Sequence, residues 1–287
     1  MNLAFASSAY RRFPLANALA AIAEAGYGAA EIMCDAPHAY PPDLGPADVD
    51  AIVATLRAHD LAVSNLNAFM MTAVHGPAAA SDLPRMARHF WLPSYVDADP
   101  TDRRKRIDHT LDALGLARQL GARTISIEPG GPLDGRDEAT ATDLFADAIA
   151  ECAERAEREG VSICIEPEPG LLIERSDQYL RFMERVDSPM VGLNLDVGHV
   201  FCVGEDPAEV ARRLGPHIRH IQIEDIAPTR EHRHLVPGDG AIDLAELRRA
   251  LDDVGYDGYV TVELYPYLDD PGDAAHRSLA HLRALGY

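Results

Sequence analysis

Eight short apolar segments, each followed by a longer helical pattern, constrain the fold of this chain more than any other feature. The segments span residues 3–7, 29–34, 61–67, 123–128, 161–166, 191–196, 218–223 and 259–264. Their length and their content of Val and Ile indicate buried strands. Between them, apolar residues recur at helical spacing, as at Leu144, Ala148 and Cys152. Gly stands where a helix must end before the next strand, as in "QLGARTI".

Eight repeats of strand then helix, with no linker rich in Pro, Gly or Ser, predict one α/β domain over residues 1–287, folded as a (β/α)8 TIM barrel. A chain of 287 residues, 47% of them hydrophobic, is long enough for such a core. The alternative is a doubly wound open sheet, which usually has a Gly-rich phosphate turn after its first strand. The sequence there is "ASSAYRR". The segment from 70 to 101 holds the only Trp, and we expect it to be a loop that roofs a pocket.

Charge and composition restrict the partners and the location. The formal net charge of −20 argues against nucleic-acid binding, and we interpret the basic run "DRRKR" at 102–106 as a solvated helix face. No run approaches the ~18 apolar residues of a membrane helix, and the first residues lack the pattern of a signal peptide. We therefore expect a cytoplasmic protein without a membrane partner, for which a homo-oligomer is possible. The four Cys form no Cys-x-x-Cys pair, which disfavours a disulfide framework and a thiolate zinc site.

Acidic residues stand at the C-terminal ends of the predicted strands, where the loops of a barrel form the active site. They are Glu128, Glu166, Asp196, Glu224, Asp225 and Glu263. A buried carboxylate costs several kcal/mol unless it is paired or binds a metal. Basic side chains or loop amides can satisfy any one of these acids. Glu166, Asp196 and Glu263 follow continuous apolar runs, and their mutual repulsion at one barrel mouth favours a divalent cation.

The predicted strand at 218–223 carries Gln222 near its end, between the strands that bear Asp196 and Glu263. The side-chain oxygen of a Gln is a neutral hard ligand. The predicted metal ligands are therefore Glu166, Asp196, Gln222 and Glu263. A set of oxygens only favours Mn²⁺ or Mg²⁺ over structural zinc, with Co²⁺ as a further candidate. The alternative is a Gln that hydrogen bonds a neighbouring carboxylate. We expect His220, one pleat below, to pack rather than to bind the metal.

A divalent ion at such a site supports proton transfer next to a carbonyl group. It acidifies the C–H between a carbonyl and a neighbouring hydroxyl and stabilises the resulting enediolate. Glu166 and Glu263 are the candidate catalytic bases that remove and return the proton. Glu168, in "EPEPG", either orients a substrate hydroxyl or is a solvated loop acid. His199 is a candidate substrate-binding residue, and the alternative is a hydrogen bond to the next loop.

The segment "REHRHLVPGDGAIDL", residues 230–244, is too polar for a buried element. Its Pro-Gly-Asp-Gly turn fixes the loop. His232, Arg233 or His234 can then reach over the metal toward an anionic or polyhydroxyl substrate. Spacing does not decide which His points inward. Glu31 and Asn67, at the ends of the second and third predicted strands, are expected to cap the next helix or loop.

These motifs resemble those of the xylose-isomerase-like barrel superfamily. The matching parts are "IEPEPG", "LDVGH", "HIQIED", "HRHLVPGDGAID" and "VTVEL". In that pattern, the metal ligands are Glu in the fifth strand, Asp in the sixth, His or Gln in the seventh and Glu in the eighth, which fall on the four predicted ligands. The resemblance also implies that His199 contacts the substrate. Ketose 3-epimerases usually carry His where this chain has Gln222. In having Gln at this position, the chain resembles hydroxypyruvate isomerase and some dehydroshikimate dehydratases.

The site and the resemblance together predict a metal-dependent isomerase or epimerase of a small sugar or hydroxy-keto acid. The alternative is a lyase that uses the same enolate, as in a 3-dehydroshikimate dehydratase or a carbon-glycoside-cleaving enzyme. A phosphodiesterase of the apurinic endonuclease kind needs two or three metals with several His ligands, and the third and fourth predicted strands end without His. A barrel that binds metal and ligand without turnover is the fourth possibility.

Overall fold

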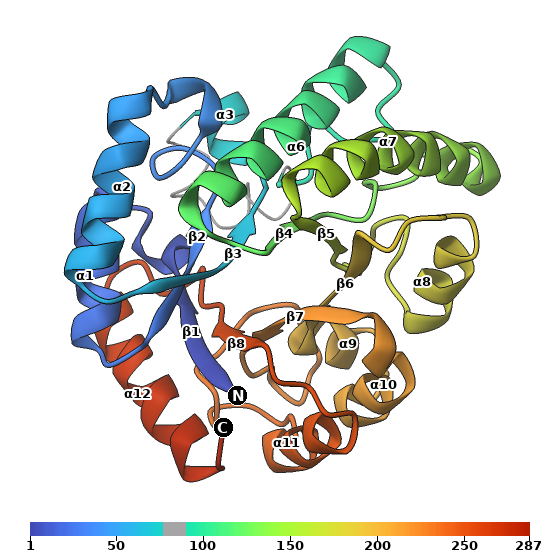
Figure 1. The fold of residues 1–287 in the computed structure, drawn as a ribbon. Coiled ribbons are helices and arrows are strands. Elements are labelled where there is room, and N and C mark those ends of the chain that lie inside the picture. Colours follow the sequence, from blue (N-terminus) through green and yellow to red (C-terminus); the bar gives the residue numbers. More distant parts are fainter. Residues whose placement is uncertain (77–89) are drawn as a thin grey trace.

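The fold is that of a computed structural model, which describes residues 1–76 and 90–287. Eight parallel strands pair in sequence order and close into a barrel (Figure 1). The strands are β1 (Asn2–Ala6), β2 (Ala29–Met33), β3 (Ala62–Asn67), β4 (Thr124–Ile127), β5 (Ser162–Ile165), β6 (Val191–Asp196), β7 (Ile218–Ile223) and β8 (Tyr259–Val262). The first and last residues of each strand differ by at most two positions from those of the corresponding predicted segment. The predicted (β/α)8 barrel is confirmed, and the open sheet is excluded.

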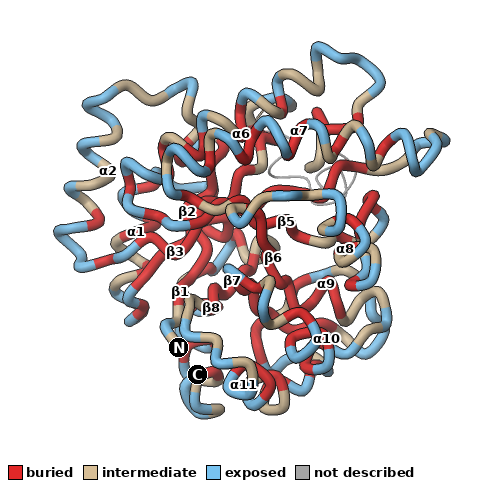
Figure 2. Tube along the Cα trace, turned by 45° about the vertical axis from the view of Figure 1, so that its right-hand side comes forward, coloured by how far each residue is buried: buried red, intermediate tan, exposed pale blue. Residues whose placement is uncertain are grey.

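The helices surround the barrel, and the buried residues concentrate on the strands and on the helix faces toward them (Figure 2). The helices are α1 (Leu15–Glu24), α2 (Pro46–Ala58), α3 (Met71–His75), α6 (Pro100–Leu120), α7 (Glu138–Glu159), α8 (Ser176–Met183), α9 (Val197–Cys202), α10 (Pro207–Leu214), α11 (Leu244–Asp253) and α12 (Pro271–Ala284). Short 3₁₀ turns span Ser7–Tyr10, Pro41–Asp43 and Gly215–His217. Gly121 and Gly160 follow α6 and α7 with φ of 79° and 65°. Only Gly adopts this left-handed conformation without strain, so both end their helices as predicted.

Polar side chains inside the barrel form a hydrogen-bond network below its C-terminal mouth. Asn194 Nδ2 donates to Gln222 Oε1 at 2.5 Å, and Asn194 Oδ1 lies 2.9 Å from His220 Nδ1. The other ring nitrogen of His220 lies 2.9 Å from Thr261 Oγ1. His220 thus packs within the barrel, as expected. Because buried polar groups that are fully hydrogen bonded hold one arrangement, this network fixes the side chains above it.

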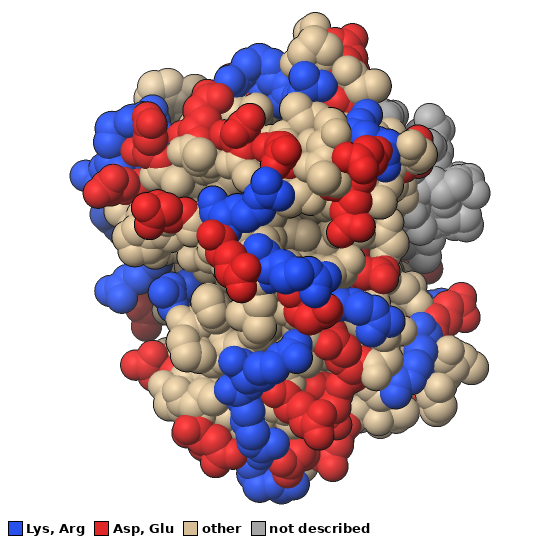
Figure 3. Space-filling view, turned by 90° about the vertical axis from the view of Figure 1, so that its right-hand side faces the viewer, with Lys and Arg blue, Asp and Glu red and all other residues tan. Residues whose placement is uncertain are grey.

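The surface is charged, with acidic and basic side chains interspersed over the face shown in Figure 3. Among the described residues, no helix combines the length and apolarity needed to cross a bilayer. The four cysteines are free, and Cys34, Cys152 and Cys164 are buried.

The basic run at 102–106 is only partly the solvated face that we expected. Arg104 and Lys105 form ion pairs in which both partners are exposed. Arg106, in contrast, is fully buried. A guanidinium can leave water only if its donors find acceptors inside the protein, so Arg106 must have a structural role. The run of basic residues in the sequence did not indicate that Arg106 lies on the inner face of α6.

Arg106 connects α6 to the segment that follows β3 and to the end of β4. Its Nε donates to the Pro93 carbonyl at 2.7 Å and its Nη1 donates to the Ala68 carbonyl at 3.1 Å. The same Nε lies 3.2 Å from Glu128 Oε1, and both side chains are 0% exposed. Burial raises the pKa of Glu128 to about 7, and the charge of Arg106 opposes this rise. The charge of the strand-end acid Glu128 is thus paired with an arginine, although neither of its carboxylate oxygens accepts a hydrogen bond from the described residues.

We predict that Arg106→Ala lowers the free energy of unfolding by about 3–5 kcal/mol, because it leaves the Glu128 carboxylate buried without a cation. Urea unfolding measures the change. The matched control is Lys105→Ala, which removes an exposed ion pair next to it and should change stability by about 0.5 kcal/mol or less. Equal effects of the two variants would show that the buried pair is not a structural requirement.

Candidate metal centre

The structure places three of the predicted metal ligands at the C-terminal mouth of the barrel. Glu166 directly follows β5, Asp196 ends β6 and Glu263 directly follows β8. All three are buried, with 2%, 1% and 8% of their surfaces exposed. The fourth predicted ligand, Gln222, pairs with Asp196 across β6 and β7.

Ligand atoms from these residues lie close together. An oxygen of Glu166, an oxygen of Asp196 and a ring nitrogen of His199 all lie within 4.8 Å of one another. Asp196, Glu263 and His234 form a second group within the same limit. Asp196 belongs to both groups and therefore links the two glutamates.

The pKa of each of the three carboxyl groups is raised, and burial is the largest cause in each case. Burial is the largest cause for Glu166, and the charges of Asp196 and Glu263 add to it. The pKa of Glu263 is raised well above its usual value by burial and then by the charge of Glu31. Burial also raises the pKa of Asp196, whose Oδ2 has no hydrogen-bond partner among the described residues. A divalent cation would offset the negative charges of the carboxylates and bind the Asp196 oxygen that lacks a partner. The residues therefore fit a metal.

Gln222 has contacts that are compatible with both interpretations of the sequence. Its Nε2 donates to Glu31 Oε1 at 2.9 Å. This contact matches the alternative interpretation, in which Gln222 hydrogen bonds a neighbouring carboxylate. Its Oε1 accepts from Asn194, and a carbonyl oxygen has a second lone pair that remains for a metal. Asn194 Nδ2 also donates to Glu166 Oε2 at 2.7 Å. One amide group therefore orients two of the predicted ligands.

The strand-end acids Asp225 and Glu224 accept hydrogen bonds from backbone amides, and Glu224 Oε2 has no partner among the described residues. Asp225 accepts from the amides of Gly238 and Ile242 and so holds the loop 230–244 in place. Glu224 accepts from the amide of Gly198 at 2.5 Å. A Cβ at Gly198 would lie 2.1 Å from Glu224 Oε1, so glycine is required at the start of α9.

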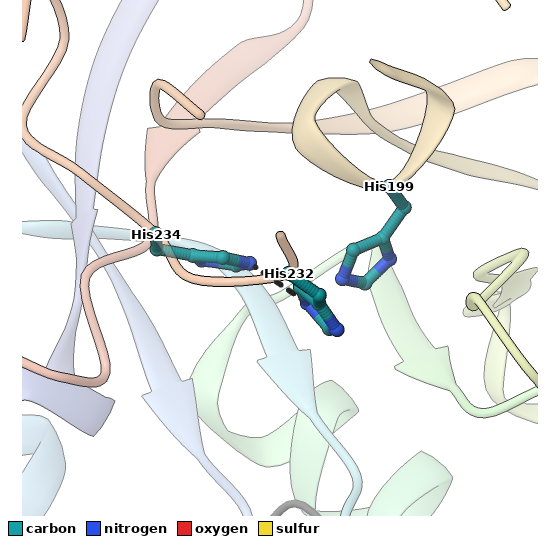
Figure 4. Close-up of side chains that lie close together, drawn as sticks. All are labelled: His199, His232 and His234. Atoms are coloured by element: carbon teal, nitrogen blue, oxygen red, sulfur yellow. Dashed lines mark hydrogen bonds between the residues drawn. The ribbon is translucent and has the colours of Figure 1, made fainter. Parts of the chain in front are cut away.

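Three histidines gather beside the acids. His199 lies in α9, and His232 and His234 lie in the loop between β7 and α11 (Figure 4). The two Nε2 atoms of His232 and His234 are 3.3 Å apart, and one ring nitrogen from each of the three residues lies within 4.8 Å of the others. Both His232 and His234 therefore point into the site. Their spacing in the sequence had not decided which of the two does so. Nitrogen donors suit zinc better than Mg²⁺, so the mouth offers two types of metal donor.

Burial favours the neutral form of the histidines in this group. Burial lowers the pKa of His232 to about 3 and that of His234 to about 4. Burial, with His234 nearby, lowers the pKa of His199 well below its usual range. A neutral imidazole has one nitrogen that accepts hydrogen bonds or binds a metal and one that donates.

Glu168 is buried, so our alternative of a solvated loop acid is wrong. Only 3% of its surface is exposed. Its Oε2 lies 3.3 Å from His199 Nε2, and its Oε1 lies 3.4 Å from His232 Nδ1. His199 Nδ1 also lies 3.1 Å from the Pro167 carbonyl, which belongs to the loop after β5 and not to the loop that follows α9. Arg233 is exposed and lies at the cavity rim.

A cavity of about 540 Å³ opens above the acids. Its polar lining includes Glu166, Glu168, His199, His232, His234 and Glu263. Trp91, from the segment that we expected to roof a pocket, contributes to its wall. Residues 77–89 of that segment lie outside the described residues.

Glu31 and Asn67 are not the caps that we expected. Glu31 is 1% exposed and accepts hydrogen bonds from Gln222 and from Asn65. Asn67 Nδ2 lies 3.3 Å from Glu263 Oε1 and donates to it. Gln222 was singled out because it is a polar residue within an apolar strand. Glu31 is also a polar residue within an apolar strand, so the same pattern could have identified it.

A closed barrel with ionisable side chains gathered at its C-terminal mouth is the arrangement of a TIM-barrel enzyme. The chain belongs to the xylose isomerase-like TIM barrel family, whose sequence profile matches residues 19–285. The family resemblance seen in the sequence is therefore confirmed.

Individual relatives are enzymes. Fructoselysine 3-epimerase of Escherichia coli O157:H7 is 26% identical over 287 residues, 96% of this chain and 95% of that protein. Inosose dehydratase of Clostridium beijerinckii is 23% identical over 225 residues, 67% of this chain and 74% of that protein. Among solved structures, the IolI protein with a zinc atom is similar over 99% of this chain and 98% of that one, with 20% identity and a TM-score of 0.79.

We predict that Gln222→Leu weakens binding of Mn²⁺ by about tenfold or more, because a ligand oxygen is lost. Gln222→His should keep a metal but shift selectivity toward softer ions, because nitrogen replaces oxygen. Metal content and affinity are measured after chelation and reconstitution.

The control is Gln119→Leu, the same substitution at an exposed position of α6. If Gln222→Leu binds the metal as well as this control does, Gln222 is only a hydrogen-bonding neighbour of Glu31 and Asn194.

Proposed function

We propose that this protein is a divalent-metal-dependent isomerase or epimerase of a sugar or hydroxy-keto acid. The observation that carries this proposal is the pair of buried carboxylates Glu166 and Glu263, both near Asp196 at the mouth of one cavity. The proposal is supported by the similarity to fructoselysine 3-epimerase, which extends over 96% of this chain.

Four residues would hold the ion: Glu166, Asp196, Gln222 and Glu263. When bound, a divalent ion would polarise a substrate carbonyl and acidify the adjacent C–H. The oxygen donors favour Mn²⁺ or Mg²⁺. Zinc is the competing candidate, because three imidazoles lie next to these oxygens and because the related IolI structure contains zinc.

In this proposal Glu166 and Glu263 remove and return the proton. Each has a side-chain amide that fixes its orientation, Asn194 for Glu166 and Asn67 for Glu263. A base works best when its pKa lies near the working pH, and burial moves both carboxyl groups in that direction from their usual acidic values. The stereochemical outcome then depends on which of the two returns the proton, and to which carbon.

Glu168 and the histidines bind and orient the substrate in this proposal. His234 Nδ1 lies 2.9 Å from the Glu263 carbonyl, so this nitrogen carries the proton and Nε2 is the acceptor. His232 Nε2 can then donate to His234 Nε2 across 3.3 Å. Glu168 lies beside His199 and His232, where it can accept from a substrate hydroxyl.

The second candidate function is a lyase. It is favoured by the similarity to inosose dehydratase. The same carboxylate would remove the proton next to the carbonyl, and a hydroxyl on the following carbon would then take this proton from the carboxyl group and leave as water. Isomerase and lyase thus share the first proton transfer and differ in the product.

Incubation of the reconstituted protein with candidate ketoses and keto acids in D₂O, followed by NMR, tests both functions. We expect metal-dependent entry of deuterium at the carbon next to the carbonyl. A new isomer in the product indicates an isomerase or epimerase, and loss of water indicates a lyase. Absence of deuterium entry throughout a panel of ketoses and keto acids would contradict the proposal.

We predict that Glu166→Gln and Glu263→Gln each lower turnover by about 10²–10⁴-fold while the barrel stays folded, because an amide occupies the same space but cannot accept the proton. Single-turnover rates and circular dichroism are measured. Glu154→Gln, at an exposed position of α7, is the control and should retain the wild-type rate. A wild-type rate in either site variant under chemistry-limited conditions would rule out the two-base assignment.

A further inference from the structure

The cavity has two chemically different sides. The side above the barrel strands carries the carboxylates and histidines of the candidate centre. The lining also contains a group of apolar side chains, here called the apolar wall: Met33, Phe69, Met71, Phe90, Trp91 and Leu171. These residues come from the end of β2, from the connection between β3 and α6, and from the loop after β5. The two sides face one continuous space.

This space is larger than a simple sugar requires. At the ~30 Å³ that a water molecule occupies in the liquid, about 540 Å³ corresponds to roughly 18 groups of that size. A hexose has twelve non-hydrogen atoms, and its hydroxyls need hydrogen-bond partners that the apolar side chains do not offer. Hydroxyl groups placed against Met71 or Leu171 would lose their hydrogen bonds to water without replacement, which is unfavourable. The apolar side therefore suits a different chemical group.

The apolar wall is organised before any ligand binds. The rings of Phe69 and Phe90 meet edge to face with centroids 5.9 Å apart, and those of Phe90 and Trp91 do so at 4.8 Å. Arg106 donates to the Trp91 carbonyl at 3.4 Å and to the Ala68 carbonyl next to Phe69 at 3.1 Å. A wall held in this way does not have to be ordered by the ligand, and preorganisation of this kind favours affinity.

We propose that the substrate is a conjugate, in which a polyhydroxyl part binds at the carboxylates and an aromatic group joined to it binds against Phe69, Phe90 and Trp91. This inference rests on the proposed function and specifies its substrate class. The aromatic rings of the wall offer edge-to-face and offset contacts to a further ring. Met71 and Leu171 supply apolar surface that a bare sugar cannot use.

Trp91 is the only Trp of the chain, so its fluorescence reports directly on this wall. The metal-reconstituted protein is titrated with matched pairs of phenyl and methyl glycosides of glucose, galactose and xylose. We expect at least one phenyl glycoside to bind about tenfold or more tightly than its methyl partner. If no phenyl glycoside binds more tightly than its methyl partner, the inference is wrong.

Variants of the wall provide the second test. Phe90→Ala should reduce the preference for phenyl over methyl to about twofold or less and leave the affinity for the methyl glycoside unchanged. Leu171→Ala tests the same wall from another loop in case Phe90→Ala fails to fold. The matched control is Phe13→Ala, because Phe13 is 42% exposed and does not line the cavity. A preference that persists in both wall variants would contradict the inference.

Failure of this inference is distinguishable from failure of the proposed function. Metal-dependent deuterium entry into free ketoses, without tighter binding of phenyl glycosides, would overturn the inference alone. Tight binding of phenyl glycosides, without deuterium entry into any ketose or keto acid, would support the apolar subsite and overturn the proposed function.

Discussion

Electrostatic repulsion among buried carboxyl groups is the constraint on which the rest of this site depends. Glu166, Asp196 and Glu263 are each buried at the mouth of one barrel, where burial disfavours the ionisation of all three and neighbouring carboxylates add to this effect at Glu166 and Glu263. Such an arrangement is unfavourable unless a cation compensates it. The barrel keeps the three groups in place because each is attached to the end of a different strand whose register is fixed by its neighbours. The proposed metal dependence follows from this cost.

Side-chain amides donate hydrogen bonds to the two candidate catalytic glutamates and orient them. Asn194 and Asn67 donate to the two glutamates, and Gln222 connects Asn194 to Glu31. Arginine at these positions would neutralise the negative charge that a cation needs, whereas an amide fixes a carboxylate and leaves its charge available. Where a carboxylate has no such function, at Glu128, the chain does use an arginine.

The sequence predicted the strands well, because hydrophobic periodicity is a local property and all eight repeats agree with one another. It also predicted which acids gather at the mouth, since parallel strands bring their C-terminal ends together. It did not predict the partners. The burial of Arg106, the position of Glu31 inside the barrel and the bridging role of Asn194 depend on neighbours distant in the chain. Asn194 lies two residues before Asp196, so strand alternation puts both on one face, but alternation does not reveal what that side chain contacts.

The two sides of the cavity belong to different parts of the chain. All the predicted metal ligands and bases come from β5 to β8 and the residues just after them, whereas most of the apolar wall comes from β2 and the connection between β3 and α6. Mutations in the first half can therefore reshape the recognition surface while the second half keeps its reactive groups. Such a division makes the barrel readily evolvable, because new molecules can be recruited to an inherited reaction by drift in wall side chains that contribute no predicted ligand or base.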